Sequence, residues 1–199
     1  DDQAKPSQTL HGAIAVFGAL DIAARAARLL NEDQQAASWE ERARELRDAI
    51  RDNFYDEQKR VFFMTDSDRL PIMASGMKPV GPTAWLVWPF SLYPLSDAQM
   101  ARQVDHDYQT VEPVIDLKTP GGLYYMKPTI SLALAGGDRH ARTVAGLPDK
   151  LAGLATPDTQ QFGETFVVLT RDGKKVADQR VATPHLWAGS LYYLTAAAA

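Results

Sequence analysis

The feature that most constrains the fold of this 199-residue chain is an alternation between two kinds of helical segment. The first kind is apolar on nearly every side, as in residues 10–30, whose first turns consist mostly of Ala, Val, Ile, Leu and Phe. The second kind is amphipathic, as in residues 34–53, where one stripe at helical spacing is apolar and the other positions are mostly charged. The stripe consists of Trp39, Ala43, Leu46 and Ile50. The chain therefore predicts buried helices that alternate with surface helices.

The same alternation continues to the C-terminus and gives seven predicted helices. The four apolar segments, predicted to be inner helices, are 10–30, 83–93, 123–135 and 184–199. The three more polar segments, predicted to be outer helices, are 34–53, 97–108 with Ser96 as its N-cap, and 138–155. This pattern predicts an all-α fold.

The connections between the predicted helices also alternate. Each inner helix passes to the next outer helix through a short turn, and each outer helix returns through a long Pro/Gly-rich loop, at 54–82, 109–122 and 156–183. In a ring of helix pairs this places the long loops, and the candidate site, at one end. Short strands are predicted within the loops, at 61–65 and in a hairpin of 165–170 with 175–179, turned through Asp172-Gly173.

Composition narrows the classes of partner. The net charge is −4 and no run of Lys or Arg occurs, which argues against nucleic acid or an anionic membrane surface. The longest apolar stretch is interrupted by Asp21 and Arg25, so no membrane span is expected. The chain has no cysteine, and its four histidines show no metal-ligand spacing, so neither a catalytic metal nor a cofactor is expected. A secreted or periplasmic location is slightly favoured over the cytoplasm.

Candidate site residues gather in the loop 156–183 and at the start of the last helix. A loop this long between helices is where an all-helical scaffold usually places its chemistry. Aromatic residues that follow glycines, at the start of two other inner helices, are added as sugar-stacking candidates. The alternatives are a surface carboxylate for Glu164, a bond to a loop carbonyl for His185, and core packing for the aromatic residues. The full set is Asp158, Gln160, Gln161, Glu164, His185, Trp187, Trp85 and Tyr124.

Two pieces of the tail carry a resemblance to a known family. They are Gln160-Gln161-Phe162-Gly163 and the segment 182–187, Ala-Thr-Pro-His-Leu-Trp. The tail resembles the glucoamylase-like glycoside hydrolases of family 15, in which a Glu-Gln loop precedes the closing helix of an (α/α)6 toroid. The resemblance implies that residues 1–199 form about helices six to twelve of one barrel domain, a partial toroid. Its missing N-terminal half would then be a partner, and this chain alone should expose a large apolar edge.

The resemblance also implies a reaction on α-linked glucosides or oligosaccharides. Two glutamates would flank the glycosidic bond, with inversion by water attack. The acid falls upstream of residue 1, and the base position holds Gln160, whose amide cannot accept a proton at neutral pH. Three explanations of Gln160 at the base position are open. Glu164 acts as the base in a shifted loop, the protein is inactive, or the glutamate was replaced deliberately. The alternatives to a glycosidase are a non-catalytic carbohydrate-sensing or regulatory domain, and a plain interaction scaffold.

Overall fold

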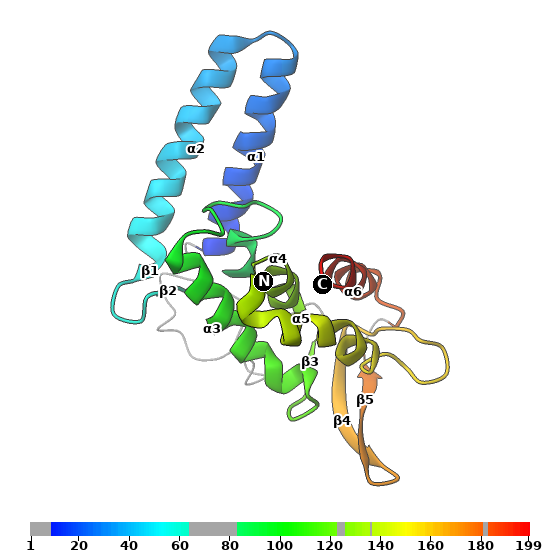
Figure 1. Ribbon diagram of the computed structural model, residues 1–199. Helices are drawn as coiled ribbons and strands as arrows, with labels where there is room; N and C mark the ends of the chain where they lie inside the picture. The colour runs from blue at the N-terminus through cyan, green and yellow to red at the C-terminus, as the bar shows by residue number, and fades with distance from the viewer. Residues whose placement is uncertain (1–8, 64–82, 123–125, 136, 181–182) are drawn as a thin grey trace.

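The computed structural model describes residues 9–63, 83–122, 126–135, 137–180 and 183–199, without the side chains at positions 139 and 187. Within these residues the chain forms six α-helices, one short 3-10 helix and a few short strands. The prediction of an all-α class is confirmed. Figure 1 shows two regions, a long helical hairpin and a group of shorter helices from which a β-hairpin extends.

The helical hairpin consists of α1 (Leu10–Leu29) and α2 (Asp33–Phe54). The side chain of Thr9 caps α1 by accepting a hydrogen bond from the Gly12 amide at 3.1 Å. The chain reverses at Asn31, whose φ of 60° closes the turn. On α2, Ala43 and Ile50 are buried while the charged positions face solvent, as the amphipathic stripe predicts. Both predicted helices are thus present within two residues of their expected bounds.

The prediction that the first helix is buried on most sides is wrong. Within the described residues, α1 is covered by α2 along its length, by η1 near its start and by Phe90 at Gly18. Ile22, Leu29 and Leu30 are exposed to 64%, 84% and 69%. The apolar sequence alone could not reveal this, because burial requires a neighbouring element and not only an apolar side chain. By length and composition alone α1 could also cross a membrane, so the absence of a membrane span stays a prediction.

The second region is built around α4 (Lys127–Ala135), which is in contact with four other elements. These elements are η1 (Thr83–Leu86), α3 (Ala98–Ile115), α5 (Gly137–Ala152) and α6 (Leu186–Ala198). The apolar side chains of α3, α4, α5 and α6 form one core with Phe166 from the β-hairpin, and Leu86 of η1 belongs to a second core with Leu10, Ile14 and Met100. Hydrogen bonds tie α4 to its neighbours: the hydroxyls of Thr129 and Thr195 are 2.9 Å apart, and Ser131 donates to the Ala84 carbonyl at 3.3 Å.

Two predicted helices differ from the structure. The apolar segment 83–93 forms only the short η1, after which the chain is irregular, because Pro89 and Pro94 offer no backbone N–H to continue a helix. The helix predicted at 97–108 instead runs from Ala98 through Pro113 to Ile115. Its N-cap is Asp97, whose side chain accepts from the Gln99 amide at 2.7 Å, and not Ser96. The long loop predicted at 109–122 is correspondingly shorter.

Two small sheets lie in the connections. Strands β1 (Tyr55–Asp56) and β2 (Val61–Phe62) pair at the end of α2. Strands β4 (Thr165–Arg171) and β5 (Lys174–Arg180) form an antiparallel hairpin, and β3 (Gly121–Gly122) pairs with β4 on its other edge. Asp172 and Gly173 both have positive φ, as a tight two-residue hairpin turn requires. The hairpin predicted from Asp172-Gly173 is confirmed.

A buried polar network joins α3 to the segments beside it. Asp107 on α3 accepts hydrogen bonds from Thr83 at 2.7 Å and from Gln103 at 2.8 Å, and His106 lies 3.3 Å from the same carboxyl. Gln103 in turn accepts from the Phe62 amide at 2.6 Å. Burial raises the pKa of Asp107, while the hydrogen bonds from His106, Thr83 and Gln103 oppose the rise. The network therefore fixes α3 against β2 and η1.

This network predicts a specific dependence of stability on pH. Because the pKa of Asp107 is raised in the folded protein, the unfolded chain releases this proton first as the pH rises above about 4. The contribution of Asp107 to stability is complete below that pH and is lost as the pH rises through the folded pKa. Asp107→Asn does not titrate and should flatten this part of the urea-unfolding profile, whereas the exposed control Asp52→Asn should not. Equal profiles for Asp107→Asn and the unmodified chain would contradict this.

Candidate functional site

A groove of about 680 Å³ lies beside the N-terminal half of α6. One side comes from the loop that leads from α5 to β4, and the other from the first turns of α6. The lining combines amide, imidazole, hydroxyl and aromatic groups with a few aliphatic side chains. It consists of Gln160, Gln161, Phe162, Pro184, His185, Leu186, Gly189, Ser190, Tyr193 and Leu194.

Backbone hydrogen bonds hold the two sides of the groove together. The His185 amide donates to the Phe162 carbonyl at 2.6 Å, which joins the loop to the start of α6. Within the loop, the Thr156 amide donates to the Gln161 carbonyl at 2.8 Å, and the Gln161 amide donates to the Thr156 hydroxyl at 2.9 Å. Gln160 has a φ of 54°, so the loop reverses sharply at this residue. The two glutamines therefore stand at a fixed turn.

The polar groups of the groove have defined hydrogen-bonding roles. His185 is the N-cap of α6, and its Nδ1 accepts from the Ala188 amide at 3.3 Å, which places the proton on Nε2. Gln160 donates to the Pro157 carbonyl at 3.2 Å, and each glutamine amide carries both donors and an acceptor. Phe162 packs on Tyr192 with ring centroids 5.3 Å apart. The groove thus presents donors and acceptors beside aromatic rings.

The structure brings together only part of the predicted site. Gln160, Gln161 and His185 line the groove as a group. Asp158 is exposed, accepts a hydrogen bond from the Thr159 amide at 2.9 Å and does not line the groove. Glu164 is half-buried immediately before β4 and is also absent from the lining. The predictions for Tyr124 and for the Trp187 side chain concern residues outside the part of the chain that the structure describes.

Sequence reasoning missed the contribution of α6 to the groove. Ser190 and Tyr193 follow His185 on α6, and Tyr193 is 71% exposed. The segment 184–199 is mostly apolar, so the sequence predicts an inner helix there and does not indicate Ser190 or Tyr193 as site residues. His185, Gly189 and Tyr193 follow one another at intervals of four residues, and Ser190 precedes Tyr193 by three, a spacing that indicates one face of the helix.

Trp85 belongs to a different cluster at the start of three helical elements. The Lys127 ammonium lies 4.5 Å from the centroid of the Trp85 ring, and the His11 ring meets Trp85 edge-on with centroids 4.0 Å apart. Lysine is solvated by default, but Lys127 is only 6% exposed. Burial lowers the pKa of Lys127 from 10.5 to about 8. The pKa of His11 is also lowered, first by burial and then by the charge of Lys127.

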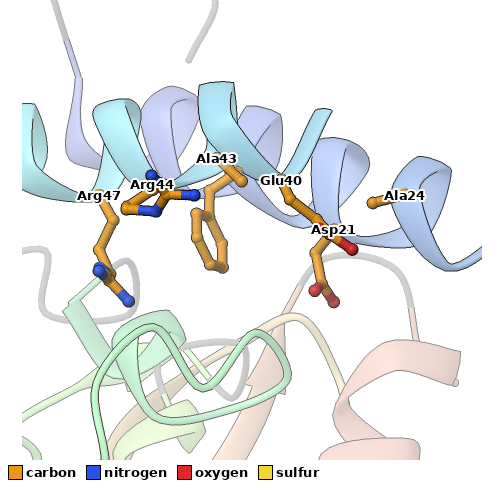
Figure 2. Close-up of a pocket in the computed structure, with 7 residues that line it drawn as sticks. Asp21, Ala24, Glu40, Ala43, Arg44 and Arg47 are labelled. Atoms are coloured by element: carbon orange, nitrogen blue, oxygen red, sulfur yellow. The ribbon is translucent and has the colours of Figure 1, made fainter. Parts of the chain in front are cut away.

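A second, smaller cavity of about 230 Å³ lies in the seam between α1 and α2. Phe17 is among its lining residues, and Figure 2 shows Arg44 and Arg47 toward one end with Asp21 and Glu40 toward the other. Neighbouring side chains already pair with several of these charges. Glu40 binds Arg28 at 2.9 Å, Asp21 binds Arg25 at 2.7 Å, and Arg44 binds Glu41 at 2.6 Å. We therefore favour the groove at α6 as the candidate site.

The described part of the chain contains no group of three or more His, Asp or Glu side chains placed to hold a metal ion. The expectation of no catalytic metal and no cofactor stays a prediction from the sequence.

No family model, curated protein or solved structure matches this chain. The resemblance to the glucoamylase-like hydrolases therefore stays a hypothesis that rests on the residues quoted for it.

The N-cap role of His185 gives a prediction about the stability of the protein. Loss of an N-cap side chain costs about 0.5–2 kcal/mol, so His185→Ala should lower the free energy of unfolding by about 1 kcal/mol. His185→Asn keeps an acceptor for the Ala188 amide and should retain most of that stability. Chemical denaturation of both variants measures the difference. Identical losses would mean that the cap is not the source of the effect.

The buried Lys127 predicts that stability rises with pH. Its folded pKa of about 8 lies below the ordinary 10.5, so between these values the unfolded chain holds the proton that the folded chain has lost. The free energy of unfolding should increase over this window by at most roughly 3 kcal/mol. Lys127→Met keeps the aliphatic length and should abolish the increase, whereas Lys174→Met at the exposed hairpin turn should retain it. A rise that persists in Lys127→Met would assign it to another group.

Proposed function

We propose that this chain binds an α-linked glucose oligosaccharide in the groove beside α6, as part of a glucoamylase-like helical protein. The observation that carries the proposal is the composition of the groove lining. Gln160, Gln161, His185 and Ser190 offer donors and acceptors that match sugar hydroxyls, and Tyr193 offers an exposed ring. Small-molecule sites usually combine apolar and aromatic walls with a few placed polar groups.

The architecture we propose is an arc of an (α/α)6 toroid. Two features of the chain support this arrangement: α1 and α2 form an antiparallel pair, and α4 packs among α3, α5 and α6. In this arc α1, α4 and α6 are the inner helices, and α2, α3 and α5 the outer ones. The groove then lies at the end where the inner helix α6 begins, among the loops. Further helices would be needed to close the ring.

For this chain alone, we favour ligand binding over hydrolysis. The described lining of the groove includes amides but no carboxylate, and an amide cannot act as the general base. Hydrolysis is the second candidate because Glu164 follows Phe162 by two residues and is half-buried, so a change in the loop would be enough to bring it to the groove. In that case Glu164 would activate water, and a carboxylic acid from outside this chain would protonate the leaving oxygen.

Calorimetric titration with maltotriose tests the binding proposal. Gln161→Ala and Tyr193→Ala should each weaken binding about tenfold or more, since the first removes hydrogen bonds to the sugar and the second removes the ring. Tyr193→Phe should bind nearly as well as the unmodified chain, because the ring is kept. Leu169→Ala, an exposed position on β4 away from the groove, serves as the matched control. No measurable heat with maltotriose would refute the proposal.

A chromogenic α-glucoside separates the two candidate functions. Under the binding proposal the chain releases no chromophore above the buffer rate, and neither Glu164→Gln nor Gln160→Glu changes this result. Turnover that disappears in Glu164→Gln would establish Glu164 as the base and favour hydrolysis. Turnover that appears in Gln160→Glu would instead identify position 160 as the base position.

A further inference from the structure

The surface of α1 that faces away from α2 carries a continuous apolar stripe. Its members are Gly12, Ala15, Ala19, Ile22, Ala26 and Leu29, all of which are exposed. Val16 and Leu30 widen the stripe on one side and are 54% and 69% exposed. Figure 1 shows that the hairpin of α1 and α2 extends away from the other helices. We call these six residues the α1 stripe.

The spacing of the α1 stripe is that of a coiled-coil seam. Its successive members are separated by three, four, three, four and three residues, which is the a and d pattern of the heptad repeat. Such a stripe lies along one line of the helix and fits another helix that packs almost parallel or antiparallel to it. The occupant that this spacing favours is a helix with the same repeat.

A second copy of α1 in the antiparallel direction complements the stripe by size. In one register, Gly12 meets Leu29 of the second copy, Ala15 meets Ala26, and Ala19 meets Ile22. Each large side chain then faces a small one, and two-fold symmetry repeats all three layers. A parallel pairing would instead place Leu29 on Leu29 and Gly12 on Gly12, which crowds some layers and leaves voids in others. The size pattern therefore selects the antiparallel pair.

Charge agrees with this pairing, and the exposed apolar area is below that of a standard interface. Arg25 is the charged residue that flanks the stripe, and its ion pair with Asp21 at 2.7 Å leaves it partly neutralised. In the antiparallel register Arg25 is level with Val16 of the second copy, so no like charges meet. The exposed Val16, Ile22, Leu29 and Leu30 with the alanines offer on the order of several hundred Å² per copy, which is less than the roughly 800 Å² per partner of a standard interface.

We propose that two copies of this chain pair through the α1 stripe as an antiparallel, two-fold symmetric dimer. The proposal goes beyond carbohydrate binding and does not depend on it, because the groove lies beside α6. It gives the exposed face of α1 to a second copy of this chain, whereas closure of an (α/α)6 ring would place further helices against the same face, so the two arrangements exclude each other there. The dimer covers the exposed apolar face of the first inner helix and leaves α2 on the outer side of the pair.

Sedimentation equilibrium in detergent-free buffer is the first test. The unmodified chain should sediment as a dimer, and Ile22→Glu should weaken the dimer at least tenfold while circular dichroism shows unchanged helix content. Leu169→Glu, on the β4–β5 hairpin, is the matched control and should remain a dimer. A monomer at all concentrations would overturn the proposal. So would a monomer that binds phosphatidylcholine vesicles, since lipid would then be the occupant of the stripe.

Disulfide trapping tests the register, and the absence of native cysteine makes each introduced thiol unambiguous. A mixture of Ala15→Cys and Ala26→Cys chains should oxidise to the mixed dimer, because these positions share a layer. Either variant alone should cross-link poorly, because its two copies are offset by roughly 16 Å at 1.5 Å per residue. Efficient cross-linking of Ala15→Cys alone would show a parallel pair and overturn the antiparallel register.

Discussion

The burial of the nine-residue helix α4 is the constraint on which the rest of the structure depends. All residues from Lys127 to Leu132 are buried, and η1, α3, α5 and α6 each pack on this helix. The hydroxyl group of Thr129 bonds to α6 and that of Ser131 bonds to η1, so these two neighbours are held at defined positions along α4. A helix that is buried over its first six residues constrains the direction of the elements around it, because close-packed interiors do not adjust continuously.

The groove follows from this arrangement in two steps. Because α4 holds α6, the N-terminus of α6 has a defined place, and the bond from the His185 amide to the Phe162 carbonyl brings the loop to it. The loop itself is held by Thr156, and Phe166 anchors the following strand in the core. The lining residues of the loop therefore lie on a rigid support, which reduces the entropy lost when a ligand binds.

Much of the fold could be predicted from the sequence, because helical spacing and turn chemistry are local. The α2 stripe and the Asp172-Gly173 turn are examples. The structure of segment 83–93 could not be predicted, because a short apolar run has no periodicity that distinguishes a helix from irregular core structure. Burial was the least predictable property, because it depends on neighbours: the apolar α1 is exposed, whereas Lys127 is buried beneath Trp85.

The candidate site was predictable in part for the same reason. Gln160, Gln161 and His185 were found because polar residues in a long loop before a helix suggest a site, and they do lie together. Ser190 and Tyr193 were not found, because an apolar helix reads as core. Nuclear magnetic resonance with maltotriose is the decisive test of the groove beside α6 as the ligand site. We expect chemical-shift changes confined to residues 160–162 and 184–194. Changes centred on Trp85, or none, would contradict this assignment.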